Sequence, residues 1–175
     1  VKGAAEGEGL GNKFLSHIRE VDAIVQVVRL FDDKDIIHVH NKIDPEDDKQ
    51  VINIELMLAD LETLSSHLDK INSKMKGAYE KELDKEKEIV EKALALLKDN
   101  KLLNSANWDD EEAKKLKQLN LLTIKPLIYL YNISENDLGK KPDLPDNALT
   151  ICAKLESELA DLSDEEAAAY LKELG

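Results

Sequence analysis

The longest periodic pattern in the chain is a stripe of apolar residues spaced alternately three and four positions apart. Its members are Ile54, Met57, Leu61, Leu64, Leu68, Ile71 and Met75. This spacing places side chains on one seam of a helix, as in coiled coils. After Gly77 a second stripe follows, with one polar member, made of Tyr79, Leu83, Glu86, Val90, Ala93 and Leu97. Two stripes joined by a short link predict an antiparallel helical hairpin with a structural core.

Short apolar runs of strand length flank this hairpin. Ala23–Val28 is rich in β-branched residues and is apolar enough to predict a strand buried on both faces. Ile36–Val39 is a second extended piece, and Leu127–Leu130 and Leu149–Ile151 follow the hairpin. We therefore predict an α/β fold, in which a parallel sheet with flanking helices carries the hairpin as an insertion.

Capping patterns predict where helices begin. Asp44-Pro45 marks one start, because proline is favoured at the first helical position. Asp109 with Glu112 is a capping box after the hairpin, and Ser163–Glu166 opens a final helix. We expect residues 51–119 to form the inserted hairpin, while residues 1–50 and 120–175 belong to the α/β domain.

The N-terminal segment combines glycines with a short apolar helix pattern. Its glycines are Gly3, Gly7, Gly9 and Gly11. Glycine at this density allows the backbone to take positive φ and to change shape. A helix is predicted to begin at Gly11 or Asn12, with one apolar face made of Phe14, Leu15 and Ile18.

Charge and composition narrow the classes of partner. The net charge is −13, and no Lys/Arg cluster is dense enough to attract a phosphate backbone, so we expect no DNA partner. No apolar run approaches the ~18 residues of a membrane span, so no membrane partner is expected either. The single cysteine excludes an internal disulfide and a Cys-rich zinc site, and no metal site is predicted. These features favour a cytoplasmic location.

Two strand ends carry polar clusters of the kind that bind a purine. Asn132-Ile133-Ser134-Glu135 follows one apolar run, and Cys152-Ala153-Lys154 follows the next. Ligands of parallel α/β domains bind beyond the carboxyl ends of the strands. Asn41-Lys42-Ile43-Asp44 is a rival, because it fits the Asn-Lys-x-Asp pattern that reads guanine. Parallel strands need a crossover of about a dozen residues, however, and the helical insertion supplies one only before Leu127–Leu130.

The residues at this candidate site predict which purine it accepts. An Asp carboxylate accepts hydrogen bonds from the N1–H and 2-amino group of guanine, and adenine has neither donor. Ile-Ser-Glu in place of Lys-x-Asp moves the carboxylate and predicts that ATP is tolerated. The alternative is structural: Asn132 caps the strand end and Glu135 is solvated.

Several blocks of the sequence resemble one protein family in the same order along the chain. The blocks are Lys2–Leu15, Arg19–Ile24, Ile36–Val39, Asp44–Asp48 and Asn132–Glu135. They resemble the YchF/Obg-like ATPases over essentially all of the chain. The resemblance implies part of a P-loop NTPase domain with a coiled-coil insertion, without the N-terminal phosphate loop and the C-terminal TGS domain. It also implies hydrolysis of ATP and secondarily GTP, use of Mg²⁺, and the ribosome as partner.

The same resemblance implies roles for individual residues. Asn132, Ile133 and Glu135 would contact adenine, and Cys152-Ala153-Lys154 would form a second base-contacting loop. Gly3, Gly7, Gly9 and Gly11 would be hinges of a nucleotide-sensitive switch. His38 matches a histidine that assists hydrolysis, and its alternative is a structural histidine at a strand end.

The sequence contains no phosphate-binding Gly-x-x-x-x-Gly-Lys-Ser/Thr motif. That loop and its Mg²⁺ supply most of the electrostatic stabilisation in phosphoryl transfer. We interpret the chain, which begins Val1-Lys2-Gly3, as a fragment that alone neither binds ATP tightly nor hydrolyses it. The rival from another class is a non-enzymatic interaction module, a helical hairpin on a small α/β base.

Overall fold

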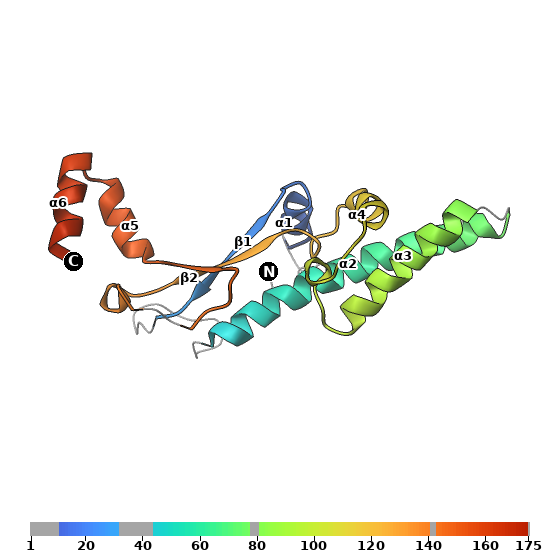
Figure 1. The fold of residues 1–175 in the computed structure, drawn as a ribbon, viewed down its shortest axis with the longest axis horizontal. Coiled ribbons are helices and arrows are strands. Elements are labelled where there is room, and N and C mark those ends of the chain that lie inside the picture. The colour runs from blue at the N-terminus through green and yellow to red at the C-terminus, as the bar shows by residue number, and fades with distance from the viewer. Residues whose placement is uncertain (1–10, 32–43, 78–80, 141–142, 175) are drawn as a thin grey trace. The chain divides into compact units, whose positions relative to one another are not determined.

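The computed structural model describes residues 11–31, 44–77, 81–140 and 143–174, and Figure 1 labels the main elements. Within these residues a three-stranded sheet has the order β1-β2-β3. The strands are β1 (Ile24–Arg29), β2 (Leu127–Asn132) and β3 (Ala148–Ile151). β2 and β3 are parallel, with Leu130 opposite Leu149. The predicted α/β class with a parallel sheet is confirmed.

Two hydrogen bonds show that β1 and β2 are also parallel. The Ile24 N–H donates to the Pro126 carbonyl at 2.9 Å, and the Leu30 N–H donates to the Asn132 carbonyl at 2.8 Å. Both bonds join residues with the same separation along the chain, as in parallel pairing. The helical insertion is therefore the crossover between β1 and β2, as the sequence predicts.

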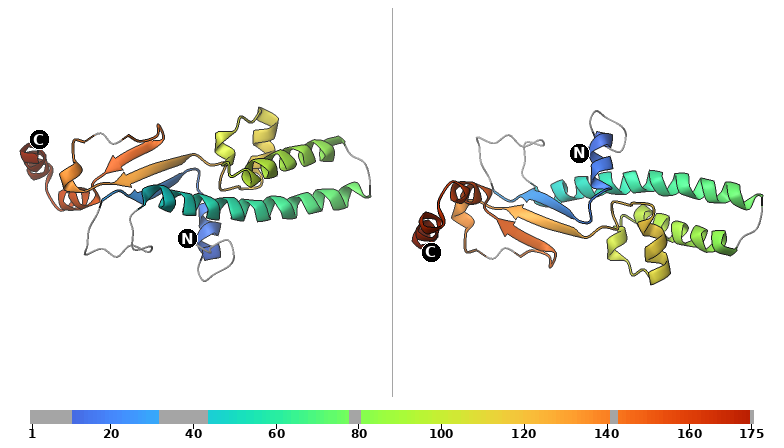
Figure 2. Two further views of the ribbon diagram at one scale, coloured as in Figure 1. Left: turned by 90° about the horizontal axis from the view of Figure 1, so that it is seen from below. Right: turned by 90° about the horizontal axis from the view of Figure 1, so that it is seen from above.

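The insertion contains a helical hairpin. Its elements are α2 (Pro45–Met75), α3 (Lys81–Lys98), the 3₁₀ turn η1 (Leu103–Ser105) and α4 (Asp110–Lys117). α2 and α3 lie side by side and antiparallel in both views of Figure 2. Proline begins α2, and a capping box of Asp109 and Glu112 begins α4, as predicted.

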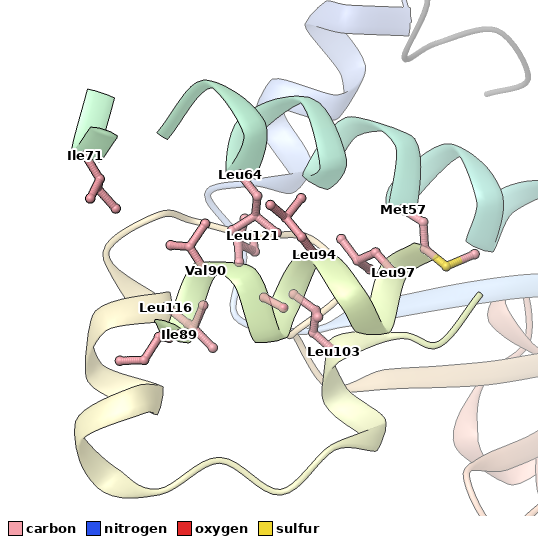
Figure 3. Packing of buried hydrophobic residues seen from close by; sticks show 11 residues of the cluster. Met57, Leu64, Ile71, Ile89, Val90, Leu94, Leu97, Leu103, Leu116 and Leu121 are labelled. Carbon is pink, nitrogen blue, oxygen red and sulfur yellow. The ribbon is translucent and has the colours of Figure 1, made fainter. Parts of the chain in front are cut away.

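The apolar seam forms the main core of this insertion. Met57, Leu64 and Ile71 of α2 are buried with Val90 and other residues of α3, as Figure 3 shows. η1 and α4 close the cluster with Leu103 and Leu116. The core residues are Met57, Leu64, Ile71, Ile89, Val90, Ala93, Leu94, Leu97, Leu103, Leu116 and Leu121.

On α2 the buried seam begins at Met57 and not at Ile54, where the sequence period places its first residue. Ile54 is 46% exposed, so the prediction that it is a seam residue is wrong. The reason is a difference in length, because α3 has 18 residues and α2 has 31. At about 1.5 Å per residue, α3 cannot cover the first part of α2. Glu86, the polar member of the second stripe, pairs with His67 of α2, with Nε2 and Oε1 2.6 Å apart.

A smaller cluster holds the first helix, α1 (Gly11–Ile18). Leu15 is buried against Leu56 and Ala59 of α2 and against Leu122, and Ile18 is partly buried there. Phe14 is 48% exposed, so its predicted place on the apolar face is wrong. An eight-residue helix buries only a narrow stripe, and here Leu15 occupies it.

β1 is buried on one face only. Gln26 and Val28 are buried, whereas Val25 and Val27 are 54% and 65% exposed. The prediction of two-sided burial is therefore wrong. β-branched residues favour a pleated strand whether or not both of its faces are covered.

The chain divides into two compact units, which we describe separately. One unit contains α1, α2, α3, η1 and α4. The other contains almost all of the sheet, the 3₁₀ turn η2 (Glu135–Asp137), α5 (Ala153–Ala160) and α6 (Asp164–Leu174). Ser163 and Glu166 cap α6 reciprocally, as predicted. Among the described helices, none combines the length and apolarity that crossing a membrane requires.

Candidate nucleotide-base pocket

The two predicted base-contacting segments lie next to each other at one edge of the sheet. Asn132, the last residue of β2, is opposite Ile151, the last residue of β3. The Ile133 N–H continues the pairing and donates to the Ile151 carbonyl at 2.8 Å. Parallel pairing therefore brings the residues after both strands to the same edge, where α/β domains bind ligands.

The side chain of Asn132 is held by the start of α5. Its Oδ1 accepts a hydrogen bond from the Ala153 N–H at 3.0 Å. Cys152 precedes the helix but its side chain makes no capping bond, so the amide of the neighbouring strand caps α5 instead. This contact fixes the carboxamide, and among the described residues its Nδ2 is a donor that no hydrogen bond uses. Asn132 therefore caps the helix rather than the end of its own strand.

Glu135 and Lys154 form an ion pair between η2 and α5. Lys154 Nζ lies 2.7 Å from Glu135 Oε2 and 3.9 Å from Glu158 Oε1. The Glu135 carboxylate raises the pKa of Lys154, so the lysine stays charged near neutral pH. Tyr170 of α6 donates to Glu158 Oε2 at 3.0 Å, which connects the last helix to the same charged row. Glu135 is thus paired, and is not simply solvated.

A cavity of about 240 Å³ lies among these residues. Its lining comprises Phe31, Asn132, Ile133, Ser134, Glu135, Asn136, Cys152 and Lys154. Ile133 and Cys152 are only 8% and 5% exposed and pack against Leu155, so they form an apolar floor. A small concave site with an apolar floor and a few convergent polar groups is the usual form of a ligand pocket.

Phe31 is a lining residue that the sequence analysis missed. It follows β1, the neighbour of β2 in the sheet. The Arg29 guanidinium lies 4.6 Å from the centre of its ring, and the Arg29 Nε donates to the Phe31 carbonyl at 3.0 Å. The signal in the sequence was an aromatic residue two positions after the end of a strand.

Other predicted functional residues lie outside the described residues. They are His38, Gly3, Gly7, Gly9 and the Asn41–Ile43 part of the rival motif. Gly11 is the first residue of α1, and Asp44 directly precedes Pro45, where α2 begins. The switch and catalytic roles therefore stay predictions. In the part of the chain that the structure describes, no cluster of His, Cys, Asp and Glu is arranged to hold a metal ion.

Comparisons with known proteins show what the whole chain is similar to. No protein-family model matches the chain. The Bacillus subtilis protein named ribosome-binding ATPase YchF is 44% identical, over 100% of this chain and 51% of that protein. Obg-like ATPase 1 from Oryza sativa subsp. indica is 38% identical, over 99% of this chain and 47% of its own length. The structure of the Schizosaccharomyces pombe YchF GTPase has a TM-score of 0.82 at 35% identity, over 99% of this chain and 51% of that chain.

The chain belongs to the YchF/Obg-like ATPase family. It spans about half the length of the curated relatives it matches. The likeness to the solved YchF structure confirms the predicted α/β fold with its long helical insertion. The family resemblance found in the sequence blocks is therefore correct.

Proposed function

We propose that these residues form the base-recognition half and the helical arm of a ribosome-associated regulatory ATPase of the YchF type. The observation that carries this proposal is the pocket at the ends of β2 and β3, where Asn132 is anchored to Ala153. Relatives are named ribosome-binding ATPase YchF and Obg-like ATPase, and a solved relative is named a YchF GTPase.

In this proposal the pocket holds the purine ring. The anchored Asn132 presents its Nδ2 donor, and Glu135 presents a carboxylate oxygen as acceptor. The segment Cys152–Lys154 forms the opposite wall, and Ile133 contributes to the apolar floor. Phe31 supplies an aromatic side chain beside the ring. Adenine fits this set, because its 6-amino group donates and its ring nitrogens accept.

The rest of the reaction needs parts that this sequence lacks. A phosphate loop and Mg²⁺ stabilise the transferring phosphoryl group. We therefore infer that these residues alone bind ATP weakly and do not hydrolyse it, and that full-length protein uses ATP, with GTP as a poorer substrate. The glycines of the N-terminal segment would act as switch hinges and His38 as an aid to hydrolysis.

The helical hairpin would report the nucleotide state to a partner. Residues 51–119, the predicted inserted arm, contain most of α2 together with α3 and α4. Arg19, directly after α1, bonds Asp60 and Thr63 of α2, so a movement of α1 would be transmitted to the arm. The partner we propose is the ribosome, in the cytoplasm, in keeping with the printed names of the relatives.

The test compares variants of the full-length protein, by which we mean these residues together with the segments that complete the length of the relatives. Asn132→Ala and Glu135→Gln are expected to change the ratio of ATP to GTP dissociation constants about tenfold or more, because each removes a base contact. Glu156→Gln is the matched control, since Glu156 is exposed on α5 and does not line the pocket.

Titration with fluorescent nucleotide, followed by competition with ATP and GTP, measures the ratio. Unchanged constants for both variants would contradict the enzyme proposal. That result would favour the interaction module, in which the hairpin binds a partner without any nucleotide. Binding of ribosomes by arm-deleted protein with unchanged nucleotide dependence would contradict the reporting role of the arm.

A further inference from the structure

We propose that Lys154 determines the purine preference of the pocket by occupying the carboxylate of Glu135. This inference rests on the proposed function, because it assumes that a purine enters the pocket between η2 and α5. It assigns to Lys154 a positioning role, which acts through Glu135 rather than through a contact with phosphate.

The two purines demand different groups from a protein. Guanine offers an acceptor at O6 and two adjacent donors, the N1–H and the 2-amino group. A carboxylate satisfies those donors only if both of its oxygens are available, since each oxygen takes one of the two parallel bonds. Adenine offers one amino group and a ring nitrogen, so a single carboxylate oxygen suffices.

One oxygen of Glu135 already accepts a charged hydrogen bond. Its Oε2 is held by the Lys154 ammonium at 2.7 Å. Lys154 projects from the first turn of α5 and has a second carboxylate, Glu158, 3.9 Å from its Nζ. The lysine is therefore held beside the pocket by its close pair with Glu135, and the contact with Glu158 is longer and weaker. Oε1 therefore keeps its full accepting capacity, which suffices for adenine, whereas the second donor of guanine would have to share Oε2 with the ammonium.

A second contact also disfavours guanine. The Ala153 N–H at the start of α5 is a donor suited to the O6 acceptor of guanine. In this structure it donates instead to Asn132 Oδ1 at 3.0 Å. Two groups that would recognise guanine are thus used within the protein. A buried polar edge of a ligand that finds no partner loses affinity.

The exposure of the pair limits the size of the effect. The Lys154 and Glu135 side chains are 67% and 36% exposed, so water and salt weaken their attraction. We therefore expect a graded preference for ATP over GTP. Removing the lysine is expected to move the preference about tenfold toward GTP, the value of one hydrogen bond gained.

The experiment measures ATP and GTP dissociation constants of full-length protein carrying Lys154→Met, Lys154→Arg or Glu158→Gln. Lys154→Met frees Glu135 while keeping an unbranched stem, so the ratio moves toward GTP. Lys154→Arg restores the ion pair and keeps the wild-type ratio. Glu158→Gln removes the second carboxylate without touching the pocket lining and leaves the ratio near wild type. High salt moves the wild-type ratio toward GTP but not that of Lys154→Met.

The outcomes separate the two proposals. If Asn132→Ala and Glu135→Gln change the ratio but Lys154→Met does not, this inference is wrong and the pocket assignment stands. If none of the variants changes nucleotide affinity, the pocket assignment itself fails. Circular dichroism of Lys154→Met checks that α5 is intact, and the ATP constant of Glu156→Gln, which changes an exposed residue of α5 outside the pocket lining, gives a folded reference.

Discussion

Arg19 and Asp60 join the end of α1 to α2 across a long separation in sequence, with Nη1 and Oδ1 3.4 Å apart. The Asp60 side chain is fully buried on α2 and also accepts from the backbone N–H groups of Leu122 and Thr123, at 2.9 and 2.7 Å. Burial raises the pKa of the Asp60 carboxyl, and these donors offset part of that rise. One carboxylate therefore ties α2 to the end of α1 and to the segment that leads into β2.

Removing this carboxylate is expected to destabilise the chain strongly. Asp60→Ala leaves the Leu122 and Thr123 N–H groups without their acceptor and Arg19 without its partner. The expected fall in the free energy of unfolding is about 3–5 kcal/mol, measured by urea denaturation. Asp69→Ala, at an exposed position of the same helix, is the control and is expected to be nearly neutral. A loss below about 1 kcal/mol for Asp60→Ala would show that the junction is dispensable.

The hairpin could be predicted from sequence because a heptad seam reports the contacts of a helix with its neighbour directly. The position where the seam ends could not, since Ile54 keeps the period although α3 stops short of it. Likewise, the partner of Glu86 could not be predicted. The pair with His67 depends on how the two helices align, and periodicity does not contain that information.

Leu64 is one of the two seam residues with no exposed surface in the described chain, together with Ala93. It is 0% exposed and lies with Val90 and Leu94 of α3 in Figure 3. Leu64→Ala is expected to lower the free energy of unfolding by about 2–5 kcal/mol, because it removes buried methyl groups and leaves a cavity. Leu58→Ala, at a 41% exposed position of the same helix, is expected to cost less than about 1 kcal/mol. Equal losses in the two variants would contradict the seam.

The pocket shows the same division between what is predictable and what is not. The proximity of Asn132 and Ala153 follows from the geometry of parallel strands, whose carboxyl ends meet at one edge. Phe31 and the pair of Glu135 with Lys154 were not predicted. They depend on side-chain directions in loops and in a first helical turn, where no sequence period applies.

Gln26 is a buried polar residue on β1 with an unsatisfied oxygen. It is 8% exposed, and within the described parts of the chain its Oε1 has no hydrogen-bond partner. Gln26→Met keeps the length of the side chain and removes the polar atoms. It is expected to raise the free energy of unfolding by about 1 kcal/mol, measured by denaturant titration. Gln50→Met, exposed on α2, is the control. A clear loss of stability for Gln26→Met would show that the amide has a partner that stabilises the fold.

The ion pair between Glu82 of α3 and Lys115 of α4 makes the stability of the folded chain depend on pH. Their Oε1 and Nζ atoms lie 2.6 Å apart, and the hydrogen bond from Lys115 lowers the pKa of Glu82 below its ordinary value of 4.5. Since the folded pKa is the lower one, the folded chain binds this proton less readily than the unfolded chain. The contribution of the pair is therefore present above pH 4.5 and is lost as the pH falls through the lowered value.

Glu82→Gln is accordingly expected to unfold at a lower temperature than wild type at pH 7. The decrease is expected to be small, because Glu82 is 68% exposed and salt screens the pair. The difference is expected to disappear in acid, where Glu82 is protonated in both the folded and the unfolded chain. Thermal unfolding measured from neutral to acidic pH gives this difference. Glu62→Gln, on the exposed face of α2, is the control because it changes the net charge of −13 by the same amount. A difference between Glu82→Gln and wild type that stays constant from neutral to acidic pH would mean that the two helices are held together without this ion pair.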